Sequence, residues 1–170
     1  VTTILPDRVL RVAFTQPYID SGIVLVVRKN APFKLLKDLD DPKYTTALLT
    51  NPQQAERAKK YFPKAKTQIF DSIASQFTAV KTNRADGAQL DTPVARWYVK
   101  QNPDMRILDE PLVPPTNNAI FMKTGDFKMW LAIDTLVGEM KGGSLFTEYS
   151  AIYEKWFGTK PLHNKYYYKP

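Results

Sequence analysis

The sequence YTTALLTNPQQ at residues 44–54 joins an apolar run directly to a strong helix start. The run from Tyr44 to Leu49 has the composition and length of a buried strand. Asn51 is a preferred N-cap residue, and Pro52 stands at the first helical position, where its missing N–H costs nothing. Gln54, three residues after the cap, can return a capping-box hydrogen bond. This stretch therefore predicts a strand followed at once by a helix.

The same alternation of strand and helix continues on both sides of this stretch. A helix at residues 71–82 places Ile73, Phe77 and Val80 on one apolar stripe, and another begins after Asp91, with Pro93 in its first turn. Alternating strands and helices are typical of an α/β fold with a parallel-type sheet covered by helices. The further strands are predicted at Ile23–Val27, Thr67–Phe70 and Gly87–Leu90.

The remaining parts of the chain predict a second, incomplete lobe. Three prolines between Pro111 and Pro115 favour an extended connector, followed by a strand at residues 118–122. Two amphipathic helices then cover residues 127–140 and 145–156, with Gly142-Gly143 between them. Residues 1–21 add one short strand, so no sheet of adequate size remains for these helices to cover. We expect one complete lobe at residues 22–110, and remnants of the other lobe with the hinge strands at residues 1–21 and 111–170.

Composition and charge exclude several classes of protein. The 170 residues are 44% hydrophobic and 24% charged, and no stretch approaches the roughly 18 apolar residues of a membrane helix. The absence of cysteine excludes disulfides, thiolate catalysis and cysteine-ligated zinc.

The net charge of +7 comes from basic residues that are mostly dispersed, and the densest group, from Arg57 to Lys66, fits the solvated face of one helix and its exit. We therefore expect no nucleic-acid partner. Val1–Ile4 lack the features of a signal peptide and do not decide the localisation.

Several segments, in order along almost the whole chain, resemble the family-3 extracellular solute-binding proteins. These proteins have the periplasmic binding protein-like II fold, with two α/β lobes joined by two crossing strands. The resemblance is carried by Thr3–Arg8, Val12–Tyr18 with Ser21-Gly22, Ile23–Lys29, Leu36–Leu39, Ala85–Asp91 and Ile152–Gly158.

The resemblance implies a periplasmic or extracytoplasmic protein that binds an amino acid or related small carboxylate for an ABC importer. Its partners would be this ligand and the permease of the transporter. In the family a further stretch precedes the equivalent of Val1 and forms most of lobe one. We therefore expect that this amino-terminal segment is cleaved, swapped, absent from this chain, or supplied by a partner chain.

The resemblance also implies a ligand site with opposite charges on facing walls. Arg8 occupies the position of the family's carboxylate-binding arginine, whose planar fork can hold both oxygens. Thr3 falls where the family contacts the same carboxylate. The alternative is that Arg8 is a surface charge in a turn.

On the other wall, Asp91 occupies the position of the family's ammonium-binding aspartate. It follows a strand, where α/β sheets place their ligands, but Asp91-Thr92-Pro93 is also an ordinary helix N-cap. Asn51 and Gln53 stand where many members carry glycine followed by serine or threonine, and Pro52 removes one donor there. Asn51 and Gln53 can contact the ligand at the helix amino terminus, or serve only the cap.

The sequence offers few candidates for chemistry. The single histidine, His163, lies in the tail, and neither a metal-ligand spacing nor a phosphate-binding loop is present. We expect a binder with no metal, no cofactor and no catalytic residue. Two rivals share the fold: an enzyme such as a cyclohexadienyl dehydratase, which would need Glu110 or Asp20 as an added acid or base, and a sensor module of a larger protein.

Overall fold

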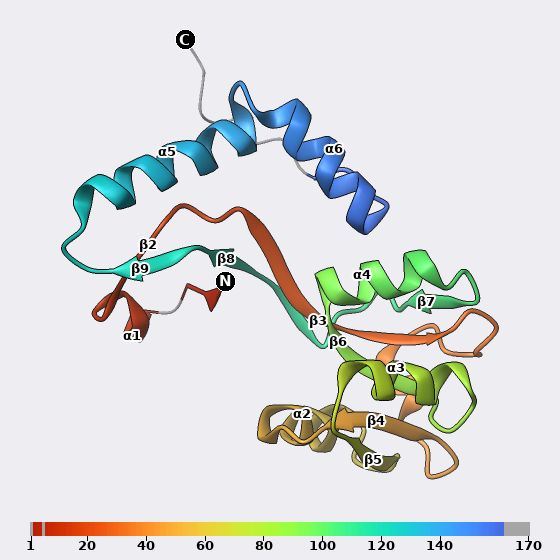
Figure 1. Cartoon of the computed structure of the whole chain (residues 1–170). Coiled ribbons are helices and arrows are strands. Elements are labelled where there is room, and N and C mark those ends of the chain that lie inside the picture. Colours follow the sequence, from red (N-terminus) through yellow and green to blue (C-terminus); the bar gives the residue numbers. More distant parts are fainter. Residues whose placement is uncertain (1, 5, 162–170) are drawn as a thin grey trace. The chain divides into compact units, whose positions relative to one another are not determined.

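The chain forms two compact units, each with its own elements of secondary structure. The computed structural model describes residues 2–4 and 6–161, with the backbone alone at residues 2 and 3. Unit 2 is Gly22–Pro114, and unit 1 combines Val1–Ser21 with Pro115–Pro170. The α/β class predicted from the sequence is confirmed in unit 2, where a mixed sheet lies between helices (Figure 1).

In the described part of the chain, the main sheet has seven strands in the order β1-β8-β3-β6-β4-β5, and β7 also pairs with β3; the strands β3 to β7 belong mainly to unit 2. β4 pairs in parallel with both β5 and β6, which gives the parallel part that the alternation predicted. β3 pairs antiparallel with β6 and β7, so the sheet is mixed and not wholly parallel. The strands that belong mainly to unit 2 are β3 (Ile19–Arg28), β4 (Thr45–Leu49), β5 (Lys66–Phe70), β6 (Gly87–Asp91) and β7 (Met105–Ile107).

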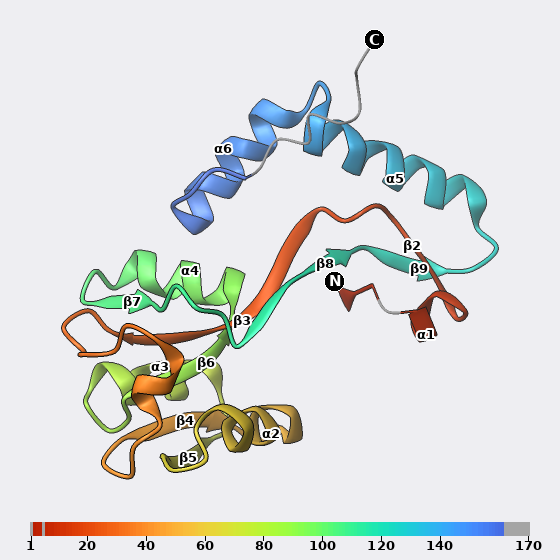
Figure 2. The ribbon, with the colours of Figure 1, turned by 180° about the vertical axis from the view of Figure 1, so that it is seen from behind.

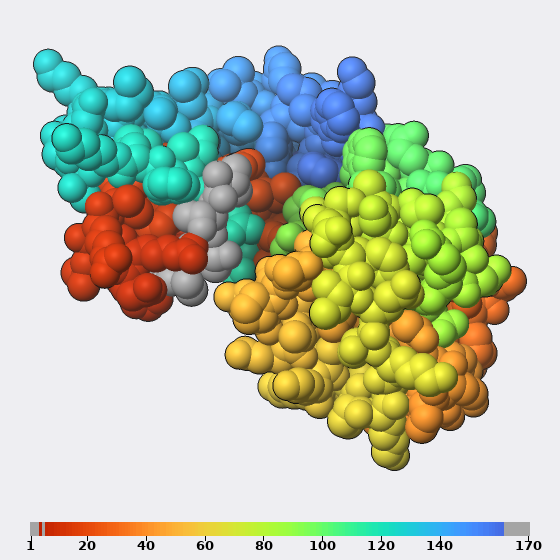
Figure 3. All heavy atoms as spheres, turned by 60° about the horizontal axis from the view of Figure 1, so that its bottom comes forward, coloured from red at the N-terminus to blue at the C-terminus, as the bar shows by residue number. Residues whose placement is uncertain are grey.

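Helices cover both faces of this sheet. Figures 1 and 2, seen from opposite sides, show α3 in front of the strands and α2 behind them. Figure 3 shows the orange to green segments of this unit closely packed against one another. The elements are η1 (Leu36–Leu39), α2 (Pro52–Tyr61), α3 (Ile73–Lys81) and α4 (Thr92–Gln101).

β3 supplies residues to two hydrophobic cores, one on each face of the sheet. Val24 and Val26 belong to the core with Phe77 and Val80 of α3. Leu25 and Val27 belong to the other core, which includes residues of η1 and Phe62 at the end of α2. Successive residues of a strand point to opposite faces, so an uninterrupted apolar run is what a strand buried on both sides requires.

The helix start at residues 51–54 forms as predicted, except for one hydrogen bond. The Asn51 side chain caps α2, accepting from the backbone N–H groups of Gln53 and Gln54. The expected capping-box return from Gln54 to Asn51 is wrong. Gln54 Oε1 accepts instead from the backbone N–H of Leu49, at 2.8 Å. The backbone N–H of Asn51 donates to the Leu49 carbonyl at 2.7 Å, so it already has a partner.

Unit 1 contains short strands and two longer helices. The strand predicted at residues 118–122 is interrupted at Ile120, whose backbone N–H and carbonyl both bond to Thr15. β9 therefore pairs with β2 and does not continue β8, which pairs with β1. The elements are β1 (Thr2–Thr3), α1 (Pro6–Val9), β2 (Val12–Phe14), β8 (Val113–Ala119), β9 (Phe121–Lys123), α5 (Phe127–Gly142) and α6 (Phe146–Phe157).

The two predicted amphipathic helices are present in unit 1, but the apolar face of α5 is largely exposed. Phe127 is 66% exposed and Leu136 is 54% exposed, while Val137 is the one buried residue of α5 in the described part of the chain. Contacts with the segment before β3 hold α5 in place. Trp130 Nε1 donates to the Phe14 carbonyl, and Asp134 accepts from the backbone of Gln16. α6 buries Tyr149 and Tyr153.

Within residues 2–4 and 6–161, none of the helices combines the length and apolar character needed to cross a bilayer.

The packing of α3 on the sheet gives a direct test of the core. Phe77 is 3% exposed and stacks on Tyr98 with ring centroids 4.6 Å apart. Phe77→Ala is expected to lower the free energy of unfolding by about 3–5 kcal/mol, because it removes buried area and leaves a cavity. Urea denaturation followed by circular dichroism measures the change. Ile69→Ala is the control, because Ile69 is 64% exposed on β5. Equal losses in the two variants would contradict this account of the core.

Candidate functional site

The carboxyl ends of β4 and β6 meet at one edge of the sheet of unit 2. The two strands pair in parallel, with Thr46 opposite Gly87 and Ala47 opposite Ala88. β4 leads through Asn51 into α2, and β6 ends at Asp91, which leads into α4. In open α/β sheets ligands bind outside the carboxyl ends of the strands. This edge, with Asn51, Gln53 and Asp91, is the candidate site of unit 2.

Three buried glutamines hold the first turn of α2 against β6. Gln76 Nε2 donates to the carbonyls of Ala47 and Gln89 and to Gln54 Oε1, at 2.7, 3.1 and 3.2 Å. Gln54 and Gln89 also exchange weaker hydrogen bonds between side chain and backbone. Gln76 and Gln89 are fully buried, so breaking this network would leave polar groups without partners in the core. The network thus fixes the position of α2 relative to the end of β6.

Arg57 extends this network toward the edge of the sheet. Its Nε donates to Gln89 Oε1 at 3.1 Å, and the residue is half-buried. Desolvation lowers the pKa of Arg57, while the charges of Asp91 and Glu56 act in the opposite direction. A guanidinium stays protonated in proteins in spite of such a shift. Arg57 is therefore a fixed positive charge that interacts electrostatically with Asp91.

The Asp91 side chain does not cap the helix that follows it. Asp91 occupies the N-cap position of α4, yet no helix amide donates to its side chain. The alternative that Asp91 is an ordinary cap is thus not supported. The residue keeps an exposed surface, but protein atoms crowd its carboxyl, and this desolvation raises its pKa. The positive charge of Arg57 lowers the pKa by a smaller amount.

The amino terminus of α2 is less available to a ligand than its position suggests. The backbone N–H groups of Gln53 and Gln54 both donate to Asn51 Oδ1, at 2.8 and 3.4 Å, and Pro52 has no N–H. Asn51 is therefore used as a helix cap. The exposed Gln53 side chain and the Asn51 amide nitrogen are the groups that remain to contact a ligand.

Thr3 and Arg8 lie in unit 1, on consecutive elements. The backbone of Thr3 pairs with Asn118 of β8, and its side chain lies outside the described residues. Arg8 is exposed in the last turn of α1, and its carbonyl accepts from the Arg11 N–H at 2.9 Å. Three of the predicted residues thus share one edge of unit 2, and the other two belong to unit 1.

Arg57 is the residue that the sequence analysis missed, because it was counted with a solvated basic face. The spacing of the buried residues along α2 could have indicated its role. Gln54 and Ala58 are the buried residues of α2, and Arg57 falls at i+3 from Gln54, on the same side of the helix. A basic residue within the buried stripe of a helix must find a polar partner, and here that partner is Gln89.

Of the residues considered for catalysis, Glu110 has a structural role and Asp20 belongs to unit 1. The Glu110 carboxylate accepts from the backbone N–H of Leu36 at 2.9 Å and so stabilises η1. Asp20 lies on the part of β3 that belongs to unit 1. His163 lies outside the described residues. No cluster of three or more metal-binding side chains occurs among residues that the structure describes.

Comparison with known proteins gives consistent matches. Residues 1–159 match the family model of the bacterial extracellular solute-binding proteins, family 3. A curated arginine-binding protein 1 of an ABC transporter in Escherichia coli is 25% identical over 158 residues, which are 91% of this chain and 63% of that protein. A glutamine-binding protein of Geobacillus stearothermophilus is 30% identical over 108 residues, covering 64% of this chain and 41% of that protein.

Solved structures agree with these matches. An ancestral cationic amino-acid solute-binding protein superposes with a TM-score of 0.80 at 30% identity, covering 92% of this chain and 66% of the other. A binding component of an ABC transporter from Wolinella succinogenes, complexed with lysine, gives a TM-score of 0.72 at 27% identity, with 93% and 68% covered. The matches to the two curated relatives cover 63% and 41% of their lengths, so this chain spans less than two thirds of each.

Replacing the Asp91 carboxyl by a neutral amide is expected to raise the free energy of unfolding, by an amount that depends on pH. Because the pKa of Asp91 is raised in the folded chain, stability is lost as the pH rises from the unfolded pKa through the folded pKa. The free energy of unfolding of Asp91→Asn should therefore exceed that of the parent at pH 7. The difference should vanish below about pH 3, where the carboxyl is protonated in both states. Urea denaturation at a series of pH values measures this, and a loss of stability at pH 7 would contradict it.

Proposed function

This chain belongs to the bacterial extracellular solute-binding proteins, family 3, and from this membership we propose that it captures an amino acid or related small carboxylate for an ABC importer. The observation that carries the proposal is Asp91 at the carboxyl end of β6, whose side chain does not cap α4, together with Arg57, which donates to Gln89 two residues earlier on the same strand. A zwitterion needs an anion for its ammonium group and a cation for its carboxylate, because a buried charge without a partner is costly. This edge offers the anion, and Arg57 adds positive charge for a further carboxylate of the ligand.

The proposed contacts divide between the two units. Asp91 takes the ammonium group, and Arg8 takes the carboxylate together with Thr3. Asn51 and Gln53 contact the ligand from the start of α2 through their side chains, since the helix amides next to Pro52 are occupied. Arg57 supplies positive charge to unit 2 where Pro52 removes an N–H donor. These roles are consistent with a ligand that carries at least one carboxylate.

Capture proceeds by closure of the two units around the ligand. β3 and β8 each contribute residues to both units, so they are the segments that would bend. A closed form then presents its surface to the permease of the importer. The protein acts outside the cytoplasm, in the periplasm or an equivalent extracytoplasmic space, as the description of its family implies.

A further part of the proposal concerns the polypeptide that completes unit 1. Phe127, Leu131 and Leu136 of α5 are each at least 47% exposed, and helices of this kind normally cover a sheet. We infer that an amino-terminal segment of lobe one, from the same protein or from a swapped partner chain, packs on α5. The curated relatives are longer than this chain, which supports this inference.

We propose binding without catalysis. The relatives named above are transport proteins, although one similar structure is described as a precursor of cyclohexadienyl dehydratase. Glu110, one of the two residues considered as the added acid or base of an enzyme, accepts a hydrogen bond from the backbone N–H of Leu36. The proposal includes no metal, no cofactor and no nucleic-acid partner.

Calorimetry with a panel of amino acids tests the main contacts. Asp91→Ala and Arg8→Ala are each expected to weaken binding of the preferred amino acid by about 30-fold or more, because each leaves one ligand charge without a partner. Arg84→Ala is the control, since Arg84 is exposed at the end of α3 and bonds to Thr82. Unchanged affinity in both site variants would remove the assignment, and binding to no member of the panel would remove the proposed ligand class.

The charge of Arg57 predicts a bias among ligands. Removing it in Arg57→Met should weaken glutamate binding more than glutamine binding, by about fivefold, because glutamate carries the additional negative charge. The ratio of the two affinities, measured by competition, gives the result independently of overall stability. Lys59→Met, an exposed position on the same helix, is the matched control. An equal loss for the two ligands would contradict a role of Arg57 in ligand charge.

A further inference from the structure

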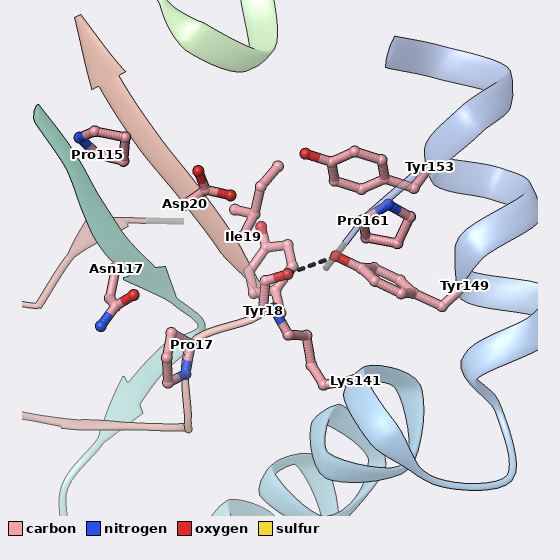
Figure 4. A pocket seen from close by; sticks show the side chains of 10 residues that line it. All are labelled: Pro17, Tyr18, Ile19, Asp20, Pro115, Asn117, Lys141, Tyr149, Tyr153 and Pro161. Carbon is pink, nitrogen blue, oxygen red and sulfur yellow. Dashed lines mark hydrogen bonds between the residues drawn. The ribbon is translucent and has the colours of Figure 1, made fainter. Parts of the chain in front are cut away.

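Unit 1 contains a cavity whose described lining residues all belong to this unit. Its volume is about 430 Å³, which is within the range of small-molecule sites. Figure 4 shows that its walls come from residues before and within β3, from β8, and from the helices α5 and α6. Its polar and aromatic lining consists of Tyr18, Asp20, Asn117, Lys141, Tyr149 and Tyr153. Arg8, Asn51, Gln53 and Asp91 are not among its described lining residues.

Two tyrosines of α6 form a fixed aromatic wall. Tyr149 and Tyr153 are buried, and their ring centroids lie 5.8 Å apart. Tyr149 Oη donates to the Tyr18 carbonyl at 2.7 Å, which locks the ring in place (Figure 4). Burial raises the pKa of Tyr149 and Tyr18, so both phenols are neutral at physiological pH. Pro17 and Pro161 add apolar surface to the same cavity.

Lys141 brings a positive charge into this cavity, and Asp20 is the opposite charge among the lining residues. It lies in the last turn of α5 and extends toward Tyr18 (Figure 4). Desolvation lowers the pKa of Lys141, and the negative charge of Asp20 opposes this effect. Within residues 2–4 and 6–161 the Lys141 ammonium has no hydrogen bond, and it has no ion pair within 4.0 Å. An anion bound here would offset the cost of its desolvation.

We propose that this cavity binds a small aromatic monocarboxylate, with the carboxylate paired to Lys141 and the ring against Tyr149 and Tyr153. The aromatic and proline walls favour a flat apolar body. Asp20 opposes a second negative charge, so a dianion such as phosphate fits less well. The half-buried position of Lys141 gives the pair more weight than an ion pair on an open surface.

Phenylacetate is the probe, because it has a ring and one carboxylate and lacks the ammonium group that Asp91 is proposed to bind. An NMR titration of the whole chain should give a Kd of about 1 mM or lower, as expected for a ligand of this size. Phenylacetamide, its neutral counterpart, should bind about tenfold more weakly. No binding of phenylacetate at that concentration overturns the proposal.

Variants locate the site. Lys141→Met should weaken phenylacetate binding about tenfold, whereas Lys128→Met, at an exposed position on the same helix, should leave it unchanged. Asp20→Asn should strengthen binding about threefold by removing a like charge, which a merely unfolded variant would not do. Loss of phenylacetate binding in Arg8→Ala but not in Lys141→Met would assign the anion to the other site and overturn the proposal. Amino-acid binding at the Asp91 site should be unaffected in Lys141→Met.

Discussion

The carboxamide of Gln76 joins three parts of unit 2 that are far apart in the sequence. It donates to the Ala47 carbonyl on β4, to the Gln89 carbonyl on β6 and to Gln54 in the first turn of α2. Because these groups are buried, they can be satisfied together only when β4, β6 and α2 hold one arrangement. That arrangement aligns the ends of both strands and points Gln89 at Arg57, so the candidate site depends on the core behind it.

The charges at this edge illustrate how a binding site opposes stability. The Asp91 carboxylate accepts no hydrogen bond from the helix that it precedes, and desolvation raises its pKa, so its ionised form is less stable in the folded chain than in water. Arg57 relieves part of this effect while being desolvated itself. A ligand with an ammonium group would stabilise Asp91, and an additional carboxylate in its side chain would stabilise Arg57. Groups that cost stability in the free protein can in this way contribute affinity.

The two units differ in how completely their own residues bury their apolar side chains. Unit 2 buries the strands β3, β4 and β6 between two hydrophobic cores, with Phe33 and Phe62 enclosed on one side and Phe77 on the other. The described part of unit 1 has two longer helices, the short α1 and short strands, and Phe127, Leu131 and Leu136 of α5 are exposed. Its ordered contacts are concentrated where residues 14–18 meet α5 and α6, through Trp130, Asp134 and Tyr149. The same meeting point encloses the cavity around Lys141.

Local sequence determined the elements of residues 22–110 and several residues of the candidate site. Asn51-Pro52, the stripe of Ile73, Phe77 and Val80, and the apolar run at 23–27 act within a few residues, and each formed where it was predicted. Tertiary structure alone decided the antiparallel pairing of β3, the interruption at Ile120, the diversion of Gln54 to Leu49 and the direction of Arg57. Each of these depends on a partner that arrives through folding, and a local pattern cannot specify which buried group will need its hydrogen bond. The cavity around Lys141 was likewise invisible in the sequence, because its walls come from residues more than a hundred positions apart.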